Sequence, residues 1–145
     1  MRARILFPHR LKNEPIRTLV EHYLKLANRH IQVDWEVVQY SDRKGRVPPR
    51  LISRMRDEQA IFLSERGLFV SSYWFREELE SVGQKGGSLL LVIGDAEGLP
   101  QPLEAACHRS IALSQLTLPH ELALVVIAEQ LWRAASMIVG HPYHK

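Results

Sequence analysis

The chain has 145 residues, of which 46% are hydrophobic and 24% charged, proportions that fit a single globular domain over residues 1–145. The formal net charge of +3 permits a nucleic-acid partner without requiring one. Cys107 is the only cysteine, which excludes an internal disulfide and favours a reducing compartment. Because no apolar run is long enough for a signal peptide or a bilayer span, we expect a soluble, cytoplasmic protein with no membrane partner.

Hydrophobic periodicity predicts strands and helices that alternate along the chain. The first half is expected to hold a strand at Arg2–Phe7, a helix near Glu14–Asn28, a strand at Val33–Gln39, a helix opened by Pro48 and Pro49, and a strand at Ala60–Leu63. The second half is expected to hold a helix at Ser72–Val82, a strand at Ser88–Ile93, a helix near Leu103–His108, a strand at Ile111–Leu113, and a long helix from Pro119. This alternation favours an α/β fold with three layers and a mainly parallel sheet.

Basic residues are concentrated just before and within the second predicted helix. No acid interrupts the stretch, whose cations are Arg43, Lys44, Arg46, Arg50, Arg54 and Arg56. A solvated helix face with its preceding loop is one interpretation. Contact with the phosphates of a polyanion is the other, since such a cluster releases counterions on binding.

A ligand of an open parallel sheet binds beyond the carboxyl ends of its strands. Three predicted loops occupy that edge: Ser64–Val70, Gly94–Pro100 and Ser114–Leu118. Glycines at both ends of the run from Gly94 to Gly98 allow a sharp turn and a close approach to a ligand. The chain has neither GxGxxG nor GxxxxGK[ST], which disfavours a Rossmann dinucleotide site and a P-loop.

The last helix and the tail after it have an unusual composition. Apolar residues surround most of the helix circumference: Leu122, Val125, Val126, Ile127, Leu131, Trp132 and Met137. A helix of this kind must be covered on more than one side. The tail, His141-Pro142-Tyr143-His144-Lys145, carries groups that can stack on a base and hold a phosphate. With Pro142 between the histidines, no cysteine partner and no HExxH, we expect no metal site.

Four segments together resemble one family. The segment IGDAEGL resembles IGGxxGL, the segment AIFLSERGLFVSSYWFREEL resembles LDxxGxxxSSxxFA, and LSQLTLPHELALVVIAEQLWRA resembles LSxxTxPHxLxRVxxxEQxYRA. With the HPYHK ending, they are similar to the RlmH family of SPOUT-class methyltransferases, which modify a pseudouridine of 23S ribosomal RNA. The likeness covers Ala60 to Lys145, whereas the first sixty residues match only in element order and charge.

The resemblance implies a fold and a cofactor site. SPOUT enzymes tie their C-terminal segment into a deep trefoil knot, the knotted loops form the S-adenosylmethionine pocket, and a homodimer completes the active site. Periodicity alone would not predict a knot, because knots are so rare. By position, the cofactor-binding residues would be Leu63, Gly94, Leu113, Ser114, Gln115, Leu116, Thr117 and Leu118.

The chain departs from the family pattern at several positions, which indicates a divergent member. Ser64 stands where the family has an acid, and Asp95 replaces the second glycine of IGGxxGL. The first strand ends in Phe7-Pro8-His9 rather than in a turn that contains glycine. Asp95 could repel part of the ligand or compensate for the acid absent at Ser64, and both interpretations stay open.

The reaction that the resemblance implies moves the sulfonium methyl group of S-adenosylmethionine to N3 of a pseudouridine in the 23S RNA of the assembled ribosome. N3 must lose a proton, which calls for a base or for hydrogen bonds that favour the anion. The candidate catalytic residues are Glu129, Arg133, Tyr143 and His144. Arg133 would hold a phosphate or a uracil carbonyl, Tyr143 would stack, and His144 would transfer the proton. The plain alternative for Glu129 and Arg133 is a surface ion pair one helical turn apart.

Two other functions stay open at this point. The chain could be a catalytically weakened homologue that docks on ribosomal RNA without methylating it. It could also be a SPOUT methyltransferase of another RNA, since the resemblance fades in the N-terminal half.

Overall fold

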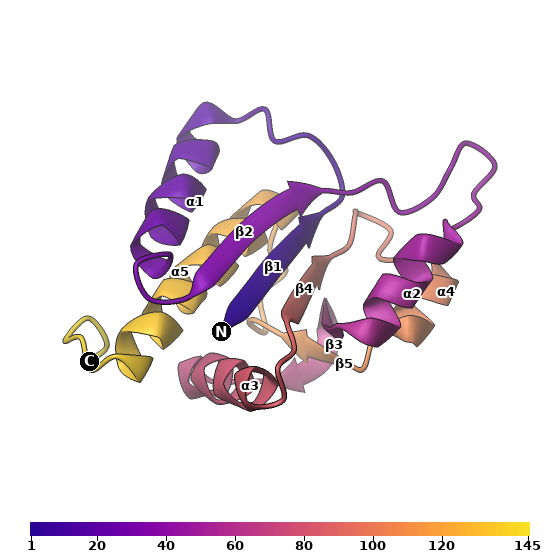
Figure 1. Ribbon diagram of the computed structural model, residues 1–145. Coiled ribbons are helices and arrows are strands. Elements are labelled where there is room, and N and C mark those ends of the chain that lie inside the picture. The colour runs from indigo at the N-terminus through magenta and orange to yellow at the C-terminus, as the bar shows by residue number, and fades with distance from the viewer.

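The computed structural model describes residues 1–145 and places one sheet of five strands between two layers of helices (Figure 1). The strands are β1 (Arg2–Phe7), β2 (Gln32–Val37), β3 (Gln59–Phe69), β4 (Leu89–Ile93) and β5 (Arg109–Ala112). The helices are α1 (Glu14–Ala27), α2 (Pro49–Asp57), α3 (Ser72–Gln84), α4 (Gln101–Ala106) and α5 (His120–Ile138). The strands lie in the order β2-β1-β4-β3-β5, and every neighbouring pair is parallel. The predicted three-layer, parallel α/β architecture is confirmed.

The face on which each helix lies follows from the direction of its crossover. The connections from β1 to β2 and from β3 to β4 run toward the β2 edge, and their helices α1 and α3 pack with α5 on one face (Figure 1). The connections from β2 to β3 and from β4 to β5 run toward the β5 edge, and α2 and α4 pack together on the other face. When all crossovers between parallel strands have the same handedness, those that run in opposite directions place their helices on opposite faces of the sheet.

The central strand is the most apolar one. Strand β4 reads LLLVI and is buried at every position, with β1 on one side and β3 on the other. A strand that is covered on both faces and both edges needs apolar side chains throughout, because no side chain reaches water. Its alternate residues enter the two cores, Leu89, Leu91 and Ile93 on the α1 face and Leu90 and Val92 on the α2 face.

Strand β3 is longer than its sequence predicts. The expected strand ends at Leu63, yet pairing with β5 resumes at Leu68, and both residues are registered with Ile111. The residues between them form a bulge, so the prediction of a loop over Ser64–Val70 is wrong for much of that segment. A Cβ atom on Gly67 would lie 2.5 Å from the carbonyl carbon of Ile111, so only glycine permits this crossing.

Other elements of the same chain bury more of helix α5 than its composition suggested. It packs against both α1 and α3, and its buried residues are Leu124, Ile127, Ala128, Leu131, Trp132, Ala134, Ala135 and Ser136. The tail folds back onto it, where the rings of Tyr143 and His141 lie 5.2 and 5.3 Å from the Trp132 ring. Leu122 remains 44% exposed. None of the helices combines the length and the apolar content that crossing a membrane needs.

Candidate functional site

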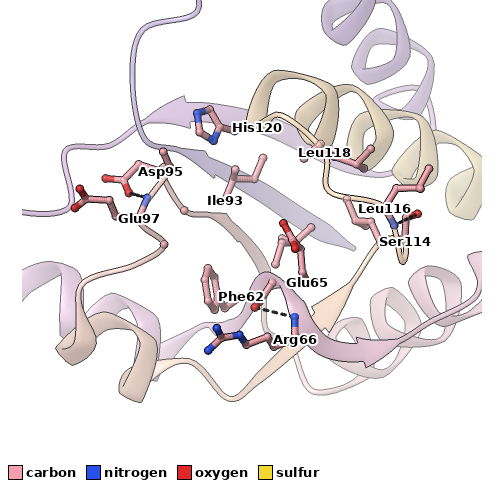
Figure 2. A pocket seen from close by; sticks show the side chains of 17 residues that line it. Phe62, Glu65, Arg66, Ile93, Asp95, Glu97, Ser114, Leu116, Leu118 and His120 are labelled. Carbon is pink, nitrogen blue, oxygen red and sulfur yellow. Dashed lines mark hydrogen bonds between the residues drawn. The ribbon is translucent and has the colours of Figure 1, made fainter.

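A cavity of about 340 Å³ opens at the carboxyl edge of the sheet (Figure 2). Its walls come from the end of β3 and its bulge, the loop after β4, the loop after β5, and the first turn of α5. This volume suits a small organic ligand. The lining residues are 62–66, 93–98, 113, 114, 116, 118, 120 and 123.

The structure brings most of the predicted cofactor residues together in this cavity. Those that line it are Leu63, Gly94, Leu113, Ser114, Leu116 and Leu118. Gln115 and Thr117 lie outside it. The hydroxyl of Thr117 instead donates a hydrogen bond to Glu65 Oε2 at 3.2 Å, which joins the loop after β5 to the bulge of β3.

The loop after β4 is closed by its own hydrogen bonds. Asp95 N–H donates to the Gly98 carbonyl at 3.2 Å, and Gly98 N–H donates back to the Asp95 carbonyl at 2.9 Å. The Asp95 carboxylate accepts the N–H of Glu97 at 2.8 Å, and Gly98 has φ of +89°. Asp95 therefore has a definite structural task, since its side chain fixes the turn that forms one wall of the cavity.

Gly94 allows the sharp turn that the sequence predicts, and its closest approach is to the backbone of that turn. A side chain there does not point into free space in the cavity, because a Cβ atom would lie 2.9 Å from the carbonyl carbon of Gly98 and 3.1 Å from its oxygen. These are backbone atoms of the closed turn and cannot rotate away as a flexible side chain would. Gly94 thus allows the turn to fold back over the end of β4.

Two further side-chain turns shape the opposite walls. Ser64 Oγ accepts the N–H of Arg66 at 3.2 Å, and Ser114 Oγ accepts the N–H of Leu116 at 3.0 Å. Figure 2 shows Leu116 and Leu118 on one side of the cavity and the carboxylates of Asp95 and Glu97 on the other. The cavity therefore suits a ligand that has an apolar ring at one end and positive charge at the other.

Tyr40 holds the β4 end of the cavity in place, and sequence reasoning did not identify it. It lies in the segment after β2, is 5% exposed, and its hydroxyl donates to the Ile93 carbonyl at 2.6 Å. Burial raises the pKa of Tyr40, so the phenol stays protonated and remains a donor. Only the tertiary structure brings these two segments together, and no local spacing around Tyr40 predicts the contact.

The predicted catalytic residues form one cluster between the second half of α5 and the tail. Glu129 Oε1 accepts hydrogen bonds from Arg133 Nε at 3.0 Å, Arg133 Nη2 at 2.6 Å and the Tyr143 hydroxyl at 3.0 Å. The Arg133 guanidinium lies 4.8 Å from the centre of the Tyr143 ring, and its Nη1 lies 3.2 Å from His144 Nδ1. The ion pair of Glu129 and Arg133 is thus part of a larger arrangement that orders the tail.

The hydrogen bonds of the cluster fix where its protons lie. Burial and the bond to Glu129 raise the pKa of Tyr143 to about 12, so the phenol is protonated at neutral pH. The bond to Glu129 also raises the pKa of Arg133. Because an arginine N–H can only donate, Nδ1 of His144 accepts in this contact, which leaves Nε2 to carry the ring N–H.

The cavity and the cluster are separated along α5. The cavity touches α5 at His120 and Ala123, whereas the cluster comprises Glu129, Arg133 and the tail. At 1.5 Å per residue, the axial distance is about 9 Å from Ala123 to Glu129 and about 20 Å from His120 to Arg133. The helix that borders the cavity with its first turn thus carries the cluster from its middle onward.

Comparison with known proteins gives a consistent result. A family model described as "Predicted SPOUT methyltransferase" matches residues 1–144. Ribosomal RNA large subunit methyltransferase H of Sorangium cellulosum is 33% identical over 144 residues and covers 99% of each chain. The protein of the same name from Anaeromyxobacter sp. is 31% identical over the full length of both chains. The one from Synechococcus sp. is 43% identical over 90 residues, which span 62% of this chain and 61% of that relative.

Solved structures share the fold at low sequence identity. A methylase family protein from Neisseria gonorrhoeae superposes with a TM-score of 0.57 at 14% identity, over 90% of this chain and 81% of the other. A methylase family protein from Haemophilus influenzae gives a TM-score of 0.55 at 15% identity, over 95% of this chain and 66% of the other. At these identities the likeness concerns the fold alone.

Proposed function

This chain belongs to the SPOUT methyltransferase family, and we propose that it transfers a methyl group from S-adenosylmethionine to N3 of a pseudouridine in the 23S RNA of the assembled ribosome. The cavity at the carboxyl edge of the sheet carries the proposal, because it unites residues from three of the four segments that resemble the family. The relatives named ribosomal RNA large subunit methyltransferase H, which align over nearly the whole chain, support an RNA substrate. A ribosomal substrate would place the reaction in the cytoplasm. Residues 1–145 would act as one domain.

The cavity suits S-adenosylmethionine chemically. The cofactor has an aromatic base, which Leu116 and Leu118 can cover, and a sulfonium and an ammonium group, which carboxylates attract. Glu65, Asp95 and Glu97 all line the cavity, so acidic groups remain beside it although Ser64 is not an acid. When bound, the cofactor supplies a methyl group that is activated by the adjacent positive sulfur.

A homodimer would unite the cavity of one chain with the cluster of another. Within one chain the two sites lie about 9 to 20 Å apart along α5, and no residue of the cluster lines the cavity. Leu116 and Leu122, which are 71% and 44% exposed, offer apolar surface beside the cavity. The side-chain carbonyl of Gln130, next to the cluster, is buried without a donor, which a second copy could provide.

The cluster is suited to orienting the base and stabilising negative charge. His144 presents an N–H at Nε2, so we propose that it donates to a uracil carbonyl next to N3 and favours the anion that forms when N3 loses its proton. Arg133, held by Glu129, adds positive charge, and Tyr143 adds a ring whose hydroxyl is already engaged. The proton of N3 then passes to solvent. This role replaces that of proton carrier for His144, because its basic nitrogen is occupied by Arg133.

We further propose that the C-terminal segment is threaded into the trefoil knot of the family. The bulge of β3 crosses β5 at Gly67 and Ile111, and the loop after β5 is bonded to that bulge through Thr117 and Glu65. These contacts bring together the two segments between which α5 would have to pass.

Methyl transfer from labelled S-adenosylmethionine tests the function. Intact large subunits that lack the modification should accept the methyl group, whereas free 23S RNA should accept far less, and mass spectrometry of the digested RNA should locate it on N3 of a pseudouridine. Calorimetry with S-adenosylmethionine alone is the companion measurement. Cofactor binding without transfer to either RNA would contradict the proposed substrate, and absence of cofactor binding would indicate a catalytically inactive homologue.

A further inference from the structure

The segment between β2 and α2 contains a tight turn that carries the exposed cations Arg43, Lys44 and Arg46. The Asp42 carboxylate accepts the N–H groups of Lys44 and Arg46, both at 2.8 Å. Asp42 N–H also donates to the Arg46 carbonyl at 2.8 Å, and Gly45 has φ of +76°. These hydrogen bonds hold the backbone of the turn in one conformation, and its cations therefore project from a defined position on the surface.

The cations of this turn make no ion pair, whereas Arg54 of the following helix does. The side chains of Arg43, Lys44 and Arg46 take part in no ion pair, and they are exposed. Arg54 of α2, in contrast, is paired with Glu36 and with Glu58, the latter at 2.9 Å. Arg50 and Arg56 of α2 take part in no ion pair either, so pairing sets Arg54 apart from the rest of the basic stretch. The charge of Arg54 is already compensated, whereas that of the turn is free to meet a polyanion.

The base of the turn is attached to the edge of the cofactor cavity. Val38 N–H donates to the carbonyl of Phe7 at the end of β1, at 2.9 Å. The buried hydroxyl of Tyr40 donates to the carbonyl of Ile93, the residue before Gly94 in the cavity wall. Figure 1 shows this segment leaving the tip of the β2 arrow, at the same edge of the sheet where β4 ends. The cations therefore stand on the side of the molecule where methyl transfer would take place.

We propose that the turn of residues 42–46 holds backbone phosphates of the ribosomal RNA beside the cofactor cavity. This inference rests on the proposed function and adds to it the surface along which the RNA backbone runs. The carboxylates of Asp95 and Glu97 at the cavity repel phosphate, so the backbone passes over Arg43, Lys44 and Arg46 while the target base alone enters. The turn attracts the RNA backbone and fixes its position along the protein. The cavity and the cluster of the second chain carry out the methyl transfer.

The test compares two triple variants of equal charge in the full-length protein. The first is Arg43→Ser, Lys44→Ser, Arg46→Ser, which keeps Asp42 and Gly45 and so keeps the backbone bonds of the turn. The control is Arg2→Ser, Arg56→Ser, Lys85→Ser, whose side chains are exposed, form no ion pair and lie at the opposite edge of the sheet, near the start of β1 and the ends of α2 and α3. Binding to large ribosomal subunits is measured over a range of salt concentrations, and S-adenosylmethionine affinity is measured for each variant.

The turn variant should bind the subunit at least ~10-fold more weakly, and the slope of log affinity against log salt should fall by about 2 to 3, close to one for each phosphate that the turn no longer neutralises. The control should stay within ~2-fold of the original protein with a slope changed by less than one, and both variants should bind S-adenosylmethionine normally. Equal losses in the two variants would overturn the proposal in favour of general attraction by net charge. An unchanged turn variant would overturn it as well. Failure of the original protein to bind or methylate the subunit would instead refute the proposed function.

Discussion

Replacing Gly94 by alanine adds one methyl group and should impair the cofactor cavity. The new Cβ atom would lie 2.9 Å from the carbonyl carbon of Gly98, closer than such atoms approach in folded proteins, so the turn from Asp95 to Gly98 must move. Forcing an extra carbon into a closed contact costs about 1–3 kcal/mol. If this cost falls on the cavity wall, S-adenosylmethionine affinity should drop by about 5- to 150-fold.

Isothermal titration calorimetry measures the affinity, and urea unfolding measures how much of the cost appears in global stability. Gly83→Ala is the matched control, because its Cβ meets only the flexible side chain of Met1, at 3.0 Å, within α3. Alanine in a helix is favoured over glycine by roughly 1 kcal/mol, so the control should be as stable as the original or more so, with unchanged affinity. Normal cofactor affinity and stability in the Gly94 variant would refute the account of this wall.

Two more substitutions test the contacts around the sites. Tyr40→Phe should lower the free energy of unfolding by about 1–3 kcal/mol and weaken cofactor binding, because the buried Ile93 carbonyl is left without its donor; urea unfolding that matches the original protein would contradict this. The Tyr143 phenol should titrate at a pKa of about 12 instead of 10, seen as the difference in ultraviolet absorbance between the original protein and Tyr143→Phe. Since this pKa is raised in the folded state, its contribution to stability is complete below pH 10 and is lost as the pH rises through 12, and titration of Tyr143 near 10 would show that the bond to Glu129 is absent.

The element order could be predicted from the sequence because each segment carries its own signal. Strand β4 reads as five consecutive apolar residues, and α1 begins where Asn13 accepts the N–H of Ile16 at 3.2 Å and Pro15 follows in the first turn. Such signals are local, since periodicity, caps and proline act within a few residues. The predicted cavity residues also came together, because the carboxyl ends of parallel strands share one edge.

The features that the sequence did not predict depend on distant partners. The extension of β3 to Phe69 exists because β5 pairs with it on both sides of a bulge, which no pattern within β3 reveals. The contact of Tyr40 with Ile93 joins positions 53 residues apart. The separation of the cavity from Arg133 follows from the length of α5 and from the side on which each site lies, which become visible only in three dimensions.

The central claim is that the cavity of one chain works with the C-terminal cluster of a second chain. Its most direct test is methyl transfer to large ribosomal subunits by a mixture of two inactive variants. One variant, Gly94→Leu, has a distorted cavity wall and an intact tail, and the other has an intact cavity and lacks Tyr143, His144 and Lys145. After the variants are unfolded together and refolded to allow exchange of chains, the account predicts that activity returns, because each mixed dimer contains one complete site. Inactivity of the mixture, with mixed dimers shown to be present by mass, would contradict the claim and place the cluster at its own chain's cavity or outside the reaction.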